Sequence, residues 1–488
     1  MLTPIKIRGR RKRPAAEHAS DEQQQQQQQG IRKVPSGPKG GRPLMSREEI
    51  VTSSQSRTAK RVRLQSAEPG RRSGTAGSAD RTKANLSILE SLPVELIEKI
   101  FLYSLNVNLP RASVVLNAAV SSERIYRALI LLAFWDDAGG RADMERTGCW
   151  DGDSESSAIP KILRPLDYTP LSEEERTALQ STVLRCRWCT LPRVLDQLPD
   201  LTNLTVQRYW VNAGISMEER QRNALARFLA REDDIDLFEG VDAQNTRFSL
   251  FIVPHVSVAV ANRETGLRRV HRVLSVRNFS EKLLSGNDGA GFGDDDSTFL
   301  EILRIACGFN RSDTLETPRA ITLSRDALQQ GIHTALVQRD TRTLTILLKL
   351  DEYFARAQNI YLPGSQPSYS LPAEHFRTAI RASPSNPVPL QLLLRASAES
   401  VPPDDAELTQ WAMDVGSPLG DWLLDLMMRV PQLAEEARDN PVQGSVFYLG
   451  RANRGSEMGA RYLGEVLEVN GLGSWMEECD VGVAELLA

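Results

Sequence analysis

Few residues of this 488-residue chain could do chemistry, and their spacing does not assemble them into a site. Cys186 and Cys189 form a C-x-x-C pair, the spacing of half a zinc site or of a redox centre. A zinc site needs four ligands, and neither a second pair nor a nearby histidine supplies the others. The βαβ pattern that accompanies a redox pair is also missing. We expect two half-buried thiols on a helix.

The five histidines lie far apart and outside any acid–base or metal motif: His18, His255, His271, His333 and His375. His255 and His271 could face each other across a β-hairpin, but histidines on an edge strand are commonly solvated. The sequence has no nucleophile elbow, P-loop or metalloprotease helix. It therefore predicts a non-catalytic protein that needs no cofactor or metal. The alternative is that the protein is an enzyme of a kind that the motifs do not reveal, and a deep polar cleft in the body would indicate it.

Charge divides the chain into a basic tail and an acidic body. Residues 1–80 hold 17 Lys and Arg against 7 Asp and Glu, whereas the remainder holds 42 against 56. A hydrophobic content of 41% is ordinary for a soluble globular protein. No run of about 18 apolar residues could span a bilayer, and the opening is too charged for a signal peptide. Five scattered cysteines favour a reducing compartment. We expect a soluble intracellular protein.

Residues 1–84 have the composition of a disordered tail, rich in Gly, Ser, Pro and Arg and with glutamines at 23–29. Two clusters resemble nuclear localisation signals: Lys6, Arg8, Arg10, Arg11, Lys12 and Arg13 in the first, and Lys60, Arg61 and Arg63 in the second. The resemblance implies an import receptor as partner and a nuclear location, with a cytoplasmic pool as alternative. The same charges could also contact nucleic acid nonspecifically in a salt-sensitive manner.

Residues 89–135 form a short helical segment with more apolar surface than it can bury alone. Pro93 suits the first turn of a helix, Pro110 opens a second, and Ser121 or Ser122 caps a third that begins at Glu123. The third helix ends in a run that is apolar on all sides. Such unburied apolar surface indicates either that another protein binds it or that the rest of this chain packs on it, and the sequence alone leaves both alternatives open.

Residues 92–101 follow the pattern L-P-x-E-x-[LI]-x-x-I-[FL], and the segment closes at Trp135. This resembles an F-box, and the stretches NLPRAS, SSERIYRAL and AFW resemble the variant found in filamentous fungi. The resemblance implies a three-helix module that binds a Skp-family adaptor and so joins a cullin–RING ubiquitin ligase. The residues it assigns to adaptor binding are Leu92, Pro93, Leu96, Ile97, Ile100, Phe101, Leu109 and Trp135.

Beyond this segment we expect a polar linker at 138–160, a helical region at 161–300 and a repeat region at 301–488, with the F-box at 85–137. Ser172 and Glu175 form a capping pattern for the first helix of the body. Residues 248–261 and 267–276 are rich in β-branched residues and flank a turn, which predicts a β-hairpin. Pro254 marks an edge or a break in its first strand.

After residue 300 the sequence predicts short helix pairs, each with a polar first helix and an apolar second helix. The second helices begin near Leu344, Leu390 and Leu419. The pattern resembles degenerate ankyrin-type repeats, which stack into a solenoid with a concave binding face. The expected fold class is mainly α, with a disordered basic tail, a three-helix F-box, and a helical body that includes a small hairpin and ankyrin-like helix pairs.

Two functions remain. The leading hypothesis is the substrate-recognition subunit of an SCF-type ubiquitin ligase, with the repeat region binding an unidentified protein target. The alternative is a non-catalytic nuclear scaffold or nucleic-acid-associated protein whose basic tail provides import or nucleic-acid contact.

Overall fold

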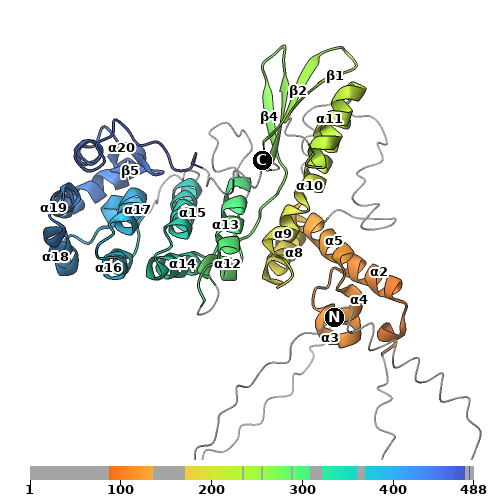
Figure 1. Cartoon of the computed structure of the whole chain (residues 1–488), viewed down its shortest axis with the longest axis horizontal. Coiled ribbons are helices and arrows are strands. Elements are labelled where there is room, and N and C mark those ends of the chain that lie inside the picture. The colour runs from red at the N-terminus through yellow and green to blue at the C-terminus, as the bar shows by residue number, and fades with distance from the viewer. Residues whose placement is uncertain are drawn as a thin grey trace, which may run out of the picture. The chain divides into compact units, whose positions relative to one another are not determined.

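The computed structural model describes residues 87–135, 171–232, 236–253, 256–286, 290–307, 321–359, 369–478 and 483. These residues belong to one compact unit that spans 80–488. Helices dominate it, and a four-stranded antiparallel sheet is its largest β element (Figure 1). The prediction of a mainly helical protein with a small antiparallel β element is therefore confirmed. The predicted disordered tail and the predicted linker at 138–160 lie outside the described residues.

The first module begins with a short 3-10 turn, η1 (Leu89–Ser91), and continues with α2 (Val94–Ser104), α3 (Leu109–Ala112), α4 (Val114–Val120) and α5 (Glu123–Phe134). Pro93 occupies the N-cap position of α2, and the Ser122 hydroxyl caps α5 by accepting from the Ile125 N–H. Three helices were predicted, but the middle one is divided. Ser113 adopts an extended conformation and caps α4 through the Leu116 N–H, which ends α3 after one turn.

Four helical segments follow: α8 (Glu173–Arg185), α9 (Leu191–Leu195), α10 (Leu198–Val206) with the π-helical turn η2 (Gln207–Val211), and α11 (Glu219–Leu229). The predicted capping box of α8 is present, because Ser172 and Glu175 each accept the other's backbone N–H. Pro199 lies in the first turn of α10. A proline there forfeits no intrahelical hydrogen bond, so it begins the helix.

The sheet consists of β1 (Leu237–Val241), β2 (Arg247–Val253), β3 (Ser257–Asn262) and β4 (Arg268–Arg272), paired antiparallel in chain order. The predicted hairpin is present as β3 and β4, with Gly266 at a φ of 70° in its turn. The run predicted as one strand is two strands, β2 and β3, on either side of the undescribed residues 254–255. Strand β1 was not predicted, because its sequence LFEGV includes Glu and Gly, which β-strands disfavour.

Four helix pairs stack after the sheet: α12 (Glu281–Ser285) with α13 (Asp294–Ala306), α14 (Arg325–Gln338) with α15 (Thr341–Asn359), α16 (Ala373–Ala382) with α17 (Val388–Ser397), and α18 (Ala406–Val415) with α19 (Pro418–Asp439). The first helices α12, α14, α16 and α18 contact one another in succession, as do the second helices α13, α15 and α17. The three pairs expected beyond residue 300 are all present. The predicted domain boundary at 300 falls inside α13, however, because an earlier pair belongs to the same stack.

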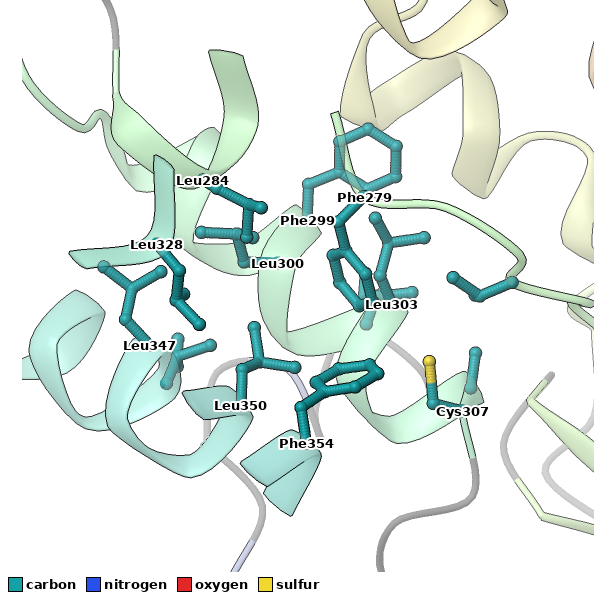
Figure 2. Packing of buried hydrophobic residues seen from close by; sticks show 14 of the residues in the cluster. Phe279, Leu284, Phe299, Leu300, Leu303, Cys307, Leu328, Leu347, Leu350 and Phe354 are labelled. Carbon is teal, nitrogen blue, oxygen red and sulfur yellow. The ribbon is translucent and has the colours of Figure 1, made fainter. Parts of the chain in front are cut away.

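The interior of the first two pairs is apolar and closely packed. Side chains of α12, α13, α14 and α15 meet there, among them Leu284, Phe299, Leu300, Leu303, Leu328, Leu347, Leu350 and Phe354 (Figure 2). The rings of Phe279 and Phe354 meet edge to face with their centroids 6.1 Å apart. A side chain at Gly331 would come within 1.9 Å of the Leu284 carbonyl oxygen, so only glycine lets α14 approach α12 this closely.

The last part of the chain folds over the second helices. It comprises α20 (Pro441–Gly444), β5 (Phe447–Tyr448), β6 (Arg451–Ala452), α21 (Glu457–Arg461) and the π-helical turn η4 (Tyr462–Val466), followed by a non-helical segment to residue 478. β5 contacts α17, whereas α20, α21 and η4 contact α19. The sequence predicted repeats throughout 301–488 and did not predict this cover.

Candidate protein-docking surfaces

One face of α2 is apolar and exposed. Leu96, Ile100 and Tyr103 lie at i, i+4 and i+7, the spacing of one helix face, and keep 44%, 40% and 50% of their surface accessible. We call these three residues the α2 stripe. Exposed apolar side chains grouped on one helix face are typical of a protein-docking surface.

The opposite face of α2 is part of the core. Ile97 and Phe101 keep only 1% and 2% of their surface accessible, and Leu102 is also buried. They belong to the same apolar cluster as Leu116 on α4 and Ile125 on α5. Adjacent residues of the motif therefore serve different purposes, because Leu96 faces outward while Ile97 holds the helix in place.

The structure accordingly distributes the eight residues that the F-box resemblance assigned to adaptor binding. Pro93, Leu96 and Ile100 are exposed, Leu92 and Leu109 are half-buried, and Ile97, Phe101 and Trp135 are buried. The buried three cannot touch a partner unless the module opens, so their role is to shape the surface. Tyr103 was not among the assigned residues, although its position seven residues after Leu96 indicates the same helix face.

The end of α5 is joined to the body by hydrogen bonds. The Trp135 carbonyl accepts from the Arg176 guanidinium of α8 at 2.6 Å, and the Phe134 carbonyl accepts from the Ser275 N–H at 2.9 Å. Both residues that donate lie outside the predicted F-box and beyond the predicted linker. These bonds hold the end of α5 against the body, so the F-box-like segment is not separate from it. The run that ends α5 is apolar on all sides because the body covers the side that α2 and α4 leave open.

Gln180 of α8 completes this junction with its whole side-chain amide. Its Nε2 donates to the carbonyl oxygens of Ala133 and Ser275 at 3.1 and 2.8 Å. Its Oε1 accepts from the backbone N–H groups of Arg277 and Asn278 at 2.7 and 2.9 Å. The residue is fully buried, so both donors and both acceptor positions are satisfied inside the protein. One side chain thereby links α5, α8 and the extended segment that follows β4.

A second surface lies on the second helices of the stack, and the chain covers it itself. Glu352 of α15 is fully buried and accepts from the Leu449 N–H at 2.8 Å and from the Trp475 indole N–H at 3.0 Å. Its other partner is Arg356, one turn further along the helix, at 2.9 Å. Burial raises the pKa of the Glu352 carboxyl to about 7, because desolvation opposes its ionisation.

Three cations beside Glu352 bind the backbone of residues 471–478, which we call the C-terminal strap. The Lys349 ammonium donates to the Glu478 carbonyl at 2.9 Å. The Arg304 guanidinium donates to the same carbonyl at 3.2 Å. Arg395 donates to the Gly473 carbonyl at 3.1 Å and to the Glu478 carboxylate at 2.7 Å. We call Arg304, Lys349, Glu352 and Arg395 the strap-binding face.

The cysteines and histidines that could have done chemistry serve packing where they are described. Cys186 and Cys189 are free and half-buried, and burial raises the pKa of Cys189 to about 12, which keeps it a thiol. His271 stacks on Tyr209 with ring centroids 3.5 Å apart, and burial lowers its pKa to about 4. The His375 Nε2 and the Gln329 Oε1 form a hydrogen bond of 2.8 Å, and burial lowers the pKa of His375 to about 4 as well. Both imidazoles are therefore neutral at pH 7.

Some predicted sites cannot be located. The basic clusters at residues 6–13 and 60–63, together with His18 and His255, fall outside the described residues. Within the described ranges, no three or more His, Cys, Asp and Glu side chains group as metal ligands would. In the same ranges, no helix combines the length and the apolar character required to cross a bilayer.

Comparison of the chain with protein-family models, curated proteins and solved structures finds no match in any of the three. The F-box and ankyrin-type resemblances therefore rest on the motif residues of this sequence alone.

Proposed function

We propose that this chain is the target-recognition subunit of an SCF-type ubiquitin ligase and that the α2 stripe binds a Skp-family adaptor. The observation that supports the proposal is the division of the F-box-like motif into two faces. Ile97 and Phe101 are buried and fix the helix, whereas Leu96 and Ile100 remain exposed. An apolar stripe of this kind gains free energy when a partner removes it from water, by about 25 cal/mol for each Å² buried.

In this proposal the chain has no catalytic role. The adaptor connects it to a cullin–RING ligase that carries the ubiquitin chemistry, and the body of stacked helix pairs binds the protein to be modified. The hydrogen bonds of Gln180 and Arg176 support this arrangement, because they join the adaptor-binding module to the body. A target bound to the body would thus be held in a defined place relative to the adaptor.

Co-purification with a Skp-family adaptor tests the proposal. The variant that carries both Leu96→Glu and Ile100→Glu places two charges in the proposed interface, where they would be desolvated without partners. It should retain no adaptor. Val337→Glu with Met428→Glu is the matched control, because these two apolar residues are also exposed but lie on α14 and α19. If the α2 variant keeps the adaptor as well as the control does, the proposal is wrong.

A substitution at Ile97 is unsuitable for this test. The motif assigns Ile97 to the adaptor interface, but its side chain is buried in the core, with 1% of its surface accessible. A charge there would unfold the module, so loss of the adaptor would say nothing about the surface.

The alternative is that the chain is a nuclear scaffold or a nucleic-acid-associated protein. Its support is the surplus of ten positive charges in residues 1–80. These charges would also bring the protein to an import receptor and into the nucleus. Retention on DNA that weakens with salt and disappears when 1–80 is deleted would favour this function. Nuclear accumulation that survives the deletion would remove the import role of the tail.

A further inference from the structure

The C-terminal strap lies on the stack as a peptide lies on a receptor. Its recognition comes from successive second helices: Arg304 on α13, Lys349 on α15 and Arg395 on α17 each donate to a strap carbonyl oxygen. Contacts with backbone carbonyls do not depend on the side chains of the bound segment. The strap turns at residues 474–478, where the Glu477 and Glu478 N–H groups donate to the Ser474 and Trp475 carbonyls. Arg304 and Lys349 converge on the Glu478 carbonyl, and Arg395 binds the Gly473 carbonyl, so three successive helices hold the strap at two points.

One strap side chain has a dedicated position. Trp475 is fully buried, its indole N–H donates to Glu352 at 3.0 Å, and the Arg395 guanidinium lies 5.1 Å from its ring centroid. A side chain at Gly450 would come within 2.3 Å of the indole. The φ of 68° at Gly450 is a second reason why this position requires glycine. A single buried tryptophan beside an arginine is typical of the energetic centre of a protein interface.

The end of the strap is bound through the charge of the Glu478 carboxylate. The Glu478 carboxylate is half exposed and pairs with Arg395 at 2.7 Å. Arg395 therefore contacts the strap in three ways, through a carbonyl, an aromatic ring and a carboxylate. This combination selects a tryptophan followed by an acidic residue three positions later.

The strap-binding face adds ionisable groups beside the apolar cluster to which Trp475 and Met476 of the strap belong. If the strap left, water could solvate Lys349, Glu352 and Arg395, whereas an apolar layer such as that between α12 and α15 would be exposed at high cost. The strap is also preceded by exposed backbone: residues 468–471 are all exposed, and Glu468 has a φ of 54°. The strap is therefore a short attached segment, and residues 468–471 in front of it contribute no buried side chain.

We propose that the strap-binding face is a binding site for peptides that carry, across one turn, a tryptophan followed three residues later by a carboxylate, and that the C-terminal strap is its intramolecular ligand. A tethered ligand acts at an effective concentration on the order of millimolar, so the strap blocks weaker peptides. This inference rests on the proposed function only in that the competing peptide would belong to a protein target.

The test is to cut the strap free and ask whether it binds again. A protease site is inserted between Asn470 and Gly471 of the full chain, where the backbone is exposed. After cleavage and removal of the fragment, a fluorescein-labelled peptide of residues 471–488 is titrated and its polarisation is followed. We expect saturable binding to the cleaved chain and none to the uncleaved chain. The peptide with Trp475→Ala should bind at least about tenfold more weakly, because it lacks the buried anchor.

A second variant guards against an indirect effect. Arg395→Ala in the cleaved chain should weaken the peptide, whereas Arg381→Ala, whose ion pairs with Glu374 and Glu407 lie on α16 and α18, should not. Circular dichroism checks that the cleaved chain keeps its helices. Loss of the helical signal, absence of peptide binding, or equal binding of the Trp475→Ala peptide would each overturn the inference. Adaptor binding by the same cleaved chain is measured separately, so that failure of the proposed function is not confused with failure of this one.

Discussion

The α2 stripe and the strap-binding face are both helical surfaces suited to a partner, but they differ in what covers them. Leu96 and Ile100 are apolar and bare, whereas Glu352 and Lys349 are ionisable and covered by residues of the same chain. A bare apolar stripe gains free energy from any apolar partner. A charged face gains only from a ligand that pairs its groups, because burying a charge without partners is unfavourable. The first surface suits a constant partner, and the second suits a selected one.

The largest expected effect comes from placing a charge on the inner face of α2 and comparing it with the same charge on the outer face. Ile97→Asp puts a charge into the core and should lower the free energy of unfolding by about 3 to 5 kcal/mol. Leu96→Asp, one residue earlier, should change it by less than about 1 kcal/mol because that side chain is exposed. Urea denaturation followed by circular dichroism measures both. Equal destabilisation by the two variants would show that the stripe is covered in solution.

The next largest effect concerns the junction between the α2 module and the body. Gln180→Ala leaves two carbonyls and two N–H groups buried without this partner and should destabilise the protein by about 2 to 4 kcal/mol. Gln410→Ala is its control, because Gln410 is exposed and bonds only to the neighbouring Asp414 on α18 in the structure. Thermal unfolding compares the pair. A Gln180 variant as stable as the control would mean that the module is not held by this residue.

A smaller effect separates the two surfaces. Trp475→Ala removes the buried anchor of the strap and leaves Glu352 with one donor fewer. The amides of residues 474–478 should then exchange hydrogen at least about tenfold faster, because local opening of the strap becomes easier. Adaptor binding through the α2 stripe should be unchanged. Hydrogen exchange read by mass spectrometry measures the first, and a loss of adaptor binding in this variant would contradict the independence of the two surfaces.

A last effect is a pH dependence of strap attachment. The pKa of Glu352 is raised from 4.5 to about 7 when the strap covers it, so the covered state holds the proton more tightly than the open state. The stabilisation from that proton is complete below about pH 4.5 and is lost as the pH rises to about 7. Exchange protection of residues 474–478 should therefore decrease between pH 5 and pH 7.5, after correction for the intrinsic exchange rate. Protection that increases over this range would show that another group controls the strap.

Local signals in the sequence predicted helix ends well. Pro93 marks the start of α2 without a capping bond, since its fixed φ suits the N-terminus of a helix. Ser122 and the Ser172 and Glu175 pair mark the starts of α5 and α8, because a cap is a contact between residues three apart. The helix pairs beyond residue 300 were predicted for the same reason, from the turns that separate them. Ser113 was a missed cap of this kind, and its extended backbone divides a helix that the sequence had joined.

The surfaces could not be assigned in this way, because burial depends on residues far along the chain. α2 carries apolar residues on most sides, so its spacing alone does not say that Ile97 is buried while Leu96 faces outward. Gln180 is an ordinary polar residue in the sequence of α8, and only its bonds to residues about a hundred positions away make it a junction. The strap is a similar case, since Trp475 meets Glu352 across 123 residues.

The central claim is that the α2 stripe is an adaptor-binding surface. Its most direct test is the dissociation constant between the full chain and a purified Skp-family adaptor, measured by titration calorimetry for the wild type, for Leu96→Glu with Ile100→Glu, and for Val337→Glu with Met428→Glu. The account predicts tight binding by the wild type and the control, and a loss of about a hundredfold or more for the stripe variant, as expected for central interface residues. Absence of binding by the wild type, or equal binding by both variants, would contradict it.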